Sequence, residues 1–128
     1  MIRVAIADDH PELRLALQLL LRTFEGIELI CKARDGREAI ECVRRYQPDV
    51  LVMDIRMPEL DGLAALKEIR GLAAPTRVIL ISTLTDSSIA MRAKAAGAHG
   101  FLPKDRLVAS LRPAIEAVYR GERFFPDL

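Results

Sequence analysis

Short apolar runs alternate with helical patterns along this chain, and the alternation limits the fold to one class. The apolar runs lie at residues 2–7, 27–33, 50–53, 78–81 and 100–102, and apolar residues recur at helical spacing between them. Short connections and right-handed crossovers wind such a chain into a parallel sheet with helices on both faces. The sequence therefore predicts an α/β fold of (βα)5 type, a doubly wound five-stranded parallel sheet.

Pro113 complicates the start of the last helix. Proline lacks an N–H, and inside a helix its ring clashes with the carbonyl four residues earlier, whereas the first helical turn tolerates it. We therefore expect the last helix to begin near Ser110 rather than at Arg106, and to end before Gly121.

Composition limits the remaining possibilities. At 128 residues and 51% hydrophobic, the chain is expected to form one domain, and the near balance of 19 Lys+Arg against 18 Asp+Glu gives no electrostatic case for nucleic acid or an anionic membrane. Cys31 and Cys42 lack a CxxC spacing, so we expect reduced, buried thiols in a cytoplasmic protein. No apolar run approaches ~18 residues, so neither a signal peptide nor a membrane span is predicted.

Acidic residues follow two of the predicted strands. Asp8 and Asp9 come after the first run and Asp54 after the third, and ligands of open α/β sheets bind at the carboxyl ends of the strands. Three carboxylates at one place need a cation, and an all-oxygen set suits Mg²⁺. An aspartate beside Mg²⁺ can also act as a nucleophile towards a phosphoryl group. The alternative, that Asp8 or Asp9 only caps the next helix, does not explain why both strand ends carry the feature.

Two more strand ends extend this polar set. Ser82 closes the fourth run, and Lys104 follows the fifth. Alone, the serine would be interpreted as a turn former and the lysine as a solvated charge. Together with the aspartates, they supply a hydroxyl donor and a cation for the oxygens of a phosphorylated aspartate. We interpret His10 as a solvated loop residue.

With these residues in place, the chain resembles the receiver domain of two-component response regulators, of the NarL/FixJ type with a LuxR-type effector. The resemblance covers residues 1–121 and depends on four motifs, 8–10 (DDH), 53–62 (MDIRMPELDG), 82–83 (ST) and 97–105 (GAHGFLPKD). It implies a flavodoxin-like receiver fold with strand order 2-1-3-4-5. It also implies that the domain is not an enzyme beyond Mg²⁺-dependent self-phosphorylation and autodephosphorylation.

The resemblance also implies roles for individual residues. Asp54 would accept a phosphoryl group from a sensor histidine kinase. Mg²⁺ would be bound by Asp9, Asp54 and the backbone carbonyl of Arg56, with Asp8 acting through water. Ser82 and Lys104 would contact the phosphoryl oxygens. Phe101 stands at the position of a switch aromatic that turns inward with the hydroxyl, although it could also be an ordinary core residue of a buried strand.

Three other functions use related features. A haloacid-dehalogenase-type phosphatase needs a second aspartate two residues after the nucleophile, where this chain has Arg56. A flavodoxin-like flavin carrier needs a phosphate-binding loop after the first strand, and uncompensated aspartates would repel phosphate there. A phosphorylation-independent receiver would act only as a protein-interaction module, but the intact acidic set argues against it. A stand-alone receiver remains the alternative to the receiver portion of a longer transcription factor.

Residues 122–128 resemble the start of the linker to a C-terminal effector domain, which is absent from this sequence. A full-length regulator of this kind would bind DNA through a helix-turn-helix, whereas residues 1–128 carry a formal charge of only +1. The expected partners are therefore a histidine kinase and a second copy of the chain. Phosphorylation is expected to favour a homodimer through the first and last helices or through the face formed by the fourth and fifth helices.

Overall fold

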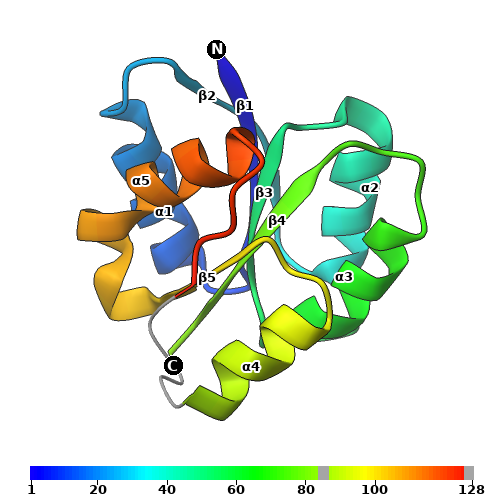
Figure 1. Cartoon of the computed structure of the whole chain (residues 1–128). Helices are drawn as coiled ribbons and strands as arrows, with labels where there is room; N and C mark the ends of the chain where they lie inside the picture. Colours follow the sequence, from blue (N-terminus) through cyan, green and yellow to red (C-terminus); the bar gives the residue numbers. More distant parts are fainter. Residues whose placement is uncertain (84–86, 126–128) are drawn as a thin grey trace.

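A five-stranded parallel sheet forms the centre of the molecule in the computed structural model, which describes residues 1–83 and 87–125. The strand order is β2-β1-β3-β4-β5 (Figure 1), so the predicted fold class and topology are confirmed. The strands are β1 (Ile2–Ala7), β2 (Ile27–Ala33), β3 (Val50–Asp54), β4 (Arg77–Ser82) and β5 (Gly100–Pro103). The α-helices are α1 (Pro11–Arg22), α2 (Gly36–Tyr46), α3 (Gly62–Arg70), α4 (Ser87–Ala95) and α5 (Leu107–Tyr119).

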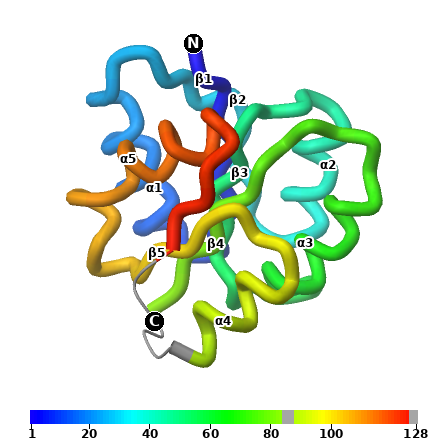
Figure 2. The backbone as a smooth tube through the Cα atoms, viewed as in Figure 1, coloured from blue at the N-terminus to red at the C-terminus, as the bar shows by residue number. Residues whose placement is uncertain are grey.

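Helices cover both faces of the sheet, as the backbone trace in Figure 2 shows. Helices α1 and α5 pack on one face, over a buried cluster that includes Leu17, Val52 and Ile115. Helices α2, α3 and α4 pack on the other face, over a cluster that includes Leu66 and Phe101. Both faces of the central strands are therefore apolar, which explains why their sequences are continuous apolar runs rather than alternating ones.

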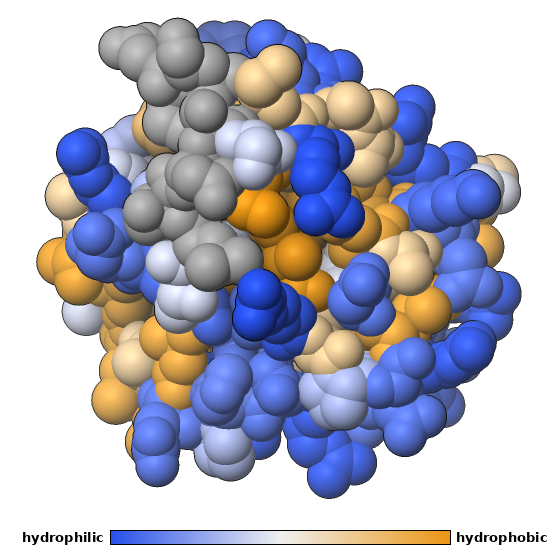
Figure 3. All heavy atoms as spheres, turned by 90° about the horizontal axis from the view of Figure 1, so that it is seen from below, coloured by the Kyte–Doolittle hydropathy of each residue, from blue (hydrophilic) through white to orange (hydrophobic). Residues whose placement is uncertain are grey.

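The strand registers bring the carboxyl ends of β1, β3, β4 and β5 to one edge of the sheet. Ala7 lies opposite Met53, Asp54 lies opposite Ile81, and Ser82 lies opposite Pro103. The residues that follow these strands are therefore neighbours in space. Figure 3 looks at the molecule from below in Figure 1, where β4 ends, and shows hydrophobic residues near the centre of this face among many hydrophilic ones.

The start of α5 differs from the prediction. The helix begins at Leu107, after a short 3-10 turn over Lys104–Arg106, and Pro113 lies inside it. Leu107 and Leu111 are both buried, one turn apart on the same face, so starting the helix early gains apolar burial. Pro113 and Ala109 are both exposed, which leaves solvent access to the face where the proline removes a backbone hydrogen bond.

The two cysteines are also not as predicted, because Cys31 and Cys42 form a disulfide. Cys31 lies on β2 and faces α2, and Cys42 lies on the buried side of α2, with a Cα–Cα distance of 6.2 Å that permits the bond. Sequence spacing alone could not show that a strand position and a helix position meet. Disulfides are unusual in the cytoplasm, and the cytoplasmic location stays a prediction. No helix in the described ranges is long and apolar enough to cross a membrane.

His99 directly precedes β5, so it lies at the amino ends of the strands, opposite the carboxyl edge. Its Nδ1 accepts a hydrogen bond from the Val78 backbone N–H at 3.1 Å, so this nitrogen must be unprotonated. Burial lowers the pKa of His99, and the nearby positive charges of Arg123, Arg77 and Arg70 lower it further. The folded protein therefore holds His99 in its neutral form more strongly than the unfolded chain does.

We expect His99 to make the fold acid-sensitive. Because its folded pKa lies below its unfolded value of about 6.5, its contribution to stability is complete above that pH. The contribution is lost as the pH falls towards the folded pKa, since the unfolded chain then binds more protons. In a His99→Asn variant, an amide oxygen can replace Nδ1 as the acceptor, so urea unfolding should show a smaller loss of stability between pH 7 and pH 5. Identical pH dependence in both proteins would contradict this origin.

Candidate functional site

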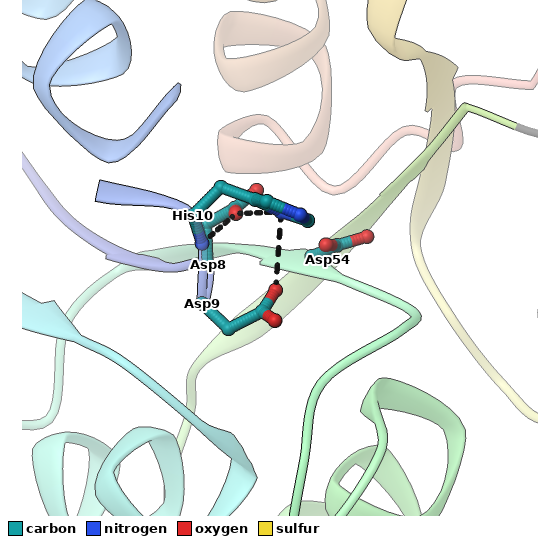
Figure 4. A group of neighbouring side chains, drawn as sticks. All are labelled: Asp8, Asp9, His10 and Asp54. Carbon is teal, nitrogen blue, oxygen red and sulfur yellow. Dashed lines mark hydrogen bonds and ion pairs between the residues drawn. The ribbon is translucent and has the colours of Figure 1, made fainter. Parts of the chain in front are cut away.

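Three aspartates meet at the carboxyl edge of the sheet. Asp8 and Asp9 lie in the loop between β1 and α1, and Asp54 ends β3 (Figure 4). One ligand atom from each of them and one from His10 all lie within 4.8 Å of one another. The structure therefore brings together the predicted acidic residues. His10 lies beside them with its side chain 66% exposed, in agreement with its interpretation as a solvated loop residue.

Asp8 is completely buried and firmly held. Its Oδ1 accepts the His10 backbone N–H at 2.9 Å, and its backbone carbonyl accepts an N–H of Arg14 at 2.7 Å. The interpretation of Asp8 or Asp9 as a helix cap is wrong, because His10 occupies the N-cap position of α1. The two carboxylates are thus available for chemistry at the edge of the sheet.

Lys104 supplies a positive charge to this cluster. Its Nζ lies 3.0 Å from Asp54 Oδ2 and 3.2 Å from Asp8 Oδ2, and only 12% of its side chain is exposed. The lysine reaches this position because β5 ends directly before it, at the same edge as β3. One ammonium therefore faces two buried carboxylates, and its charge does not neutralise the cluster.

The surroundings of Asp54 stabilise the negative charge of its carboxylate only in part. Burial raises the pKa of its carboxyl, and the negative charge of Asp8 raises it further, while the hydrogen bond and charge of Lys104 act in the opposite direction. The backbone N–H of Arg56 donates to Asp54 Oδ1 at 3.3 Å, a long hydrogen bond. A carboxylate that is buried with so few donors is poorly solvated in this state.

The two predicted switch residues lie in the core beside the acidic cluster. Ser82 is 2% exposed at the end of β4, one residue beyond the position opposite Asp54. Phe101 on β5 is 1% exposed, and its ring belongs to the buried cluster under α2, α3 and α4. The structure thus shows Phe101 in an inward position.

Two glycines shape the β3–α3 loop, and the sequence did not show their importance. A Cβ at Gly62 would collide with the Asp54 carbonyl oxygen and lie 2.8 Å from Ile55 Cα. A Cβ at Gly36, the first residue of α2, would collide with the Leu60 carbonyl oxygen in the same loop. The loop therefore folds back onto the backbone of Asp54 and rests on α2, an arrangement that only tertiary structure reveals.

The donor set fits a divalent metal ion. Asp8 Oδ2 and Asp9 Oδ1 are buried oxygens without a hydrogen-bond donor among the described residues. Asp8 Oδ2 has the ion pair with Lys104, and Asp9 Oδ1 lies 3.3 Å from His10 Nδ1. Buried carboxylate oxygens normally need a donor or a cation, and oxygen ligands suit a hard cation such as Mg²⁺. These residues therefore fit the magnesium site that the sequence predicts.

The family of this chain follows from a match of its sequence to a known domain. The sequence model of the response regulator receiver domain matches residues 4–116, which is most of the chain. The chain belongs to the response regulator receiver family. The match favours a receiver over a dehalogenase-type phosphatase or a flavin carrier as the explanation of the acidic site.

Relatives of this receiver include regulators of the type that the sequence predicts. It is 35% identical over 124 residues to the Fimbriae Z protein of Salmonella typhimurium, an alignment that covers 97% of this chain and 59% of that protein. The solved signal receiver domain of NarL from Mycobacterium tuberculosis is 34% identical with a TM-score of 0.89, covering 94% of this chain and 98% of that one. A LuxR-family two-component response regulator from Aurantimonas is 33% identical with a TM-score of 0.90, covering 95% and 87%.

The receiver spans about three fifths of the length of the curated relatives it matches. These relatives include transcriptional regulators, such as one from Pseudomonas aeruginosa. The resemblance to the NarL and LuxR type is thus confirmed.

Proposed function

We propose that this receiver accepts a phosphoryl group on Asp54 from a sensor histidine kinase and thereby switches a transcription-regulating effector. The observation that carries the proposal is the position of the Asp54 carboxylate, buried at the end of β3 with Lys104 Nζ at 3.0 Å and the Asp8 and Asp9 carboxylates beside it. A poorly solvated carboxylate next to a fixed cation is suited to attack phosphorus.

The transfer is a simple displacement at phosphorus. An oxygen of Asp54 forms the new P–O bond, the P–N bond to the kinase histidine breaks, and the released imidazole nitrogen takes up a proton. Asp9, Asp54 and the Arg56 carbonyl would hold Mg²⁺, with Asp8 acting through water, and the bound ion supplies neutralising charge for the phosphoryl oxygens. Lys104 is already held between Asp8 and Asp54, so its ammonium needs little rearrangement to pair with those oxygens.

Phosphorylation then changes the balance of conformations. The product adds roughly −1.5 to −2 charges and three acceptor oxygens beside Lys104, so the lysine and the Ser82 hydroxyl gain a new partner. Ser82 ends β4 ahead of α4, Lys104 follows β5 ahead of α5, and Phe101 lies on β5 itself. We infer that the phosphorylated receiver favours one arrangement of this region by population shift.

Intact-mass measurement tests the proposal directly. After incubation with phosphoramidate or acetyl phosphate and Mg²⁺, the protein should gain the mass of one phosphoryl group, and chelation of Mg²⁺ should prevent the gain. Phosphoramidate has a P–N bond, so it also mimics the kinase phosphohistidine. A protein that stays unmodified would support the alternative, a receiver that acts only as an interaction module.

A Lys104→Ala variant should still be phosphorylated but should respond weakly. The lysine contacts two buried carboxylates, so its removal should also cost roughly 1–3 kcal/mol of stability. Ser82→Ala should share the weak response. Chemical-shift changes in α4, β5 and α5 on phosphorylation measure the response, and urea unfolding measures the stability. Lys67→Ala, on the exposed surface of α3, is the control, and a wild-type response in both site variants would refute these roles.

Two further proposals concern partners. Exposed apolar side chains occur on α1 (Leu15 and Leu19) and on α5 (Val108 and Tyr119), and these helices share one face of the sheet. They support a homodimer through the first and last helices. A formal charge of +1 gives this receiver little attraction for DNA, so we assign DNA binding to an effector domain that would follow the linker.

A further inference from the structure

The segment that follows α5 pairs with the edge of the sheet. Phe124 donates its backbone N–H to the His99 carbonyl at 3.0 Å, and Phe101 donates its backbone N–H to the Phe124 carbonyl at 2.9 Å. Arg123 Nη1 adds a hydrogen bond of 2.7 Å to the Ala98 carbonyl. In Figures 1 and 2 this segment, coloured red, runs back along β5. Residues 123–125, named here the C-terminal strap, therefore continue the sheet beyond β5.

The two phenylalanines of the strap lie on opposite faces of the sheet. Phe124 packs against the cluster under α1 and α5, whereas Phe125 packs against the cluster that contains Phe101. Lys94 of α4 lies over the Phe125 ring, 5.8 Å from its centre. The strap thus contacts β5 through its backbone and the cluster around Phe101 through a side chain.

Gly100 allows the strap to approach closely. A Cβ at this position would lie 3.1 Å from the Phe124 carbonyl oxygen and 3.2 Å from Ile79 Cγ1. Both distances are shorter than ordinary packing contacts, and one of the two atoms belongs to the strap backbone. A side chain at residue 100 would therefore require the Phe124 carbonyl or the Ile79 side chain to move by a few tenths of an ångström, which weakens the contact of the strap with β5.

We propose that the edge of β5 and the adjoining side of α4 form a docking surface for the C-terminal strap, and that the burial of Phe101 controls how firmly the strap is held. The backbone N–H of Phe101 bonds to the strap, and its ring shares a cluster with Phe125, so an outward turn of the ring removes packing around Phe125, beside that hydrogen bond. The strap thus transmits the state of the switch to the chain that leaves the receiver. The link to phosphorylation rests on the proposed function of Asp54, whereas the link between Phe101 and the strap does not.

Amide hydrogen exchange of residues 1–128 tests the docking itself. The Phe124 and Phe101 amides should exchange at least about tenfold faster in Phe125→Ala and in Gly100→Ala than in the wild type, because local opening becomes easier. Phe24→Ala is the matched control, since Phe24 is also half-buried and has Arg112 over its ring at 5.6 Å, but on the other face. Amides of β3 measure global stability in each variant. Wild-type exchange at Phe124 in both Phe125→Ala and Gly100→Ala would overturn the docking.

A second arm tests the coupling to Phe101. Phe101→Leu keeps an apolar core residue but removes the ring, and it should accelerate Phe124 exchange as Phe125→Ala does, by a larger factor than it accelerates the β3 amides, which report the lost core packing. In the wild type, phosphorylation should slow Phe124 exchange severalfold. A phosphorylated protein, verified by mass, whose Phe124 exchange is unchanged would overturn the coupling while the proposed function stands. A protein that takes up no phosphoryl group would instead refute the proposed function, and Phe101→Leu would then decide the coupling alone.

Discussion

An Asp54→Asn variant will take up no phosphoryl group from phosphoramidate under conditions in which the wild type is modified. The amide has nearly the same shape as the carboxylate but is not a nucleophile. Intact mass measures the result. Asp105→Asn, which changes an exposed carboxylate close to Lys104, is the control and should be modified at the wild-type rate. Modification of the Asp54→Asn variant at that rate would show that another residue is the acceptor.

The same substitution should leave the fold intact and make it more stable. The folded pKa of Asp54 is raised by burial, so the ionised carboxylate destabilises the protein at pH values above that pKa. In metal-free buffer at pH 7, Asp54→Asn should therefore gain stability over the wild type. The gain should disappear as the pH falls towards the unfolded pKa of about 3.9, and urea unfolding at several pH values will show it.

Mg²⁺ binding should depend much more on Asp9 than on Asp8. Asp9 is partly exposed and its buried Oδ1 has no hydrogen-bond donor among the described residues, so it is free to ligate. Asp8 is fully buried and its Oδ2 faces Lys104. We expect Asp9→Ala to weaken Mg²⁺ affinity by at least about tenfold, an effect of the size seen when metal-site residues are removed. Asp8→Ala should weaken it less.

Titration calorimetry can measure this difference, and chemical shifts can follow it residue by residue. The matched control is Asp61→Ala, which removes a carboxylate that caps α3 rather than one in the acidic cluster. Asp61→Ala should cost stability but leave Mg²⁺ affinity close to that of the wild type. Unchanged titrations for both Asp8→Ala and Asp9→Ala would reject the proposed metal site.

Sequence patterns predicted most of this fold because each element carries its own signal. The strands are continuous apolar runs, and one rule about parallel sheets is enough to place Asp8, Asp54 and Lys104 at the same edge. The predicted start of α5 was wrong because the local rule about Pro113 was given more weight than the apolar residues Leu107 and Leu111, which are buried one turn apart. Those leucines were visible in the sequence.

Other features could not be predicted from local patterns. The Cys31–Cys42 bond depends on how α2 lies on β2. Arg14 holds the Asp8 carbonyl from the first turn of α1, although its spacing resembles that of any surface arginine. The close contacts of Gly36 and Gly62 are likewise tertiary, because the atoms they approach come from other elements. In each case, the contact joins two segments that are apart in the sequence, and local patterns do not show that they meet.

The contact between Gly36 and the Leu60 carbonyl has a consequence for engineering. The β3–α3 loop directly follows Asp54, which makes it an obvious segment to exchange between receivers. In this protein the loop rests on the first residue of α2, where no side chain fits. A grafted loop whose backbone lies closer to Gly36 or farther from it would therefore collide with α2 or leave a gap. The loop and the start of α2 should be exchanged together, as one unit.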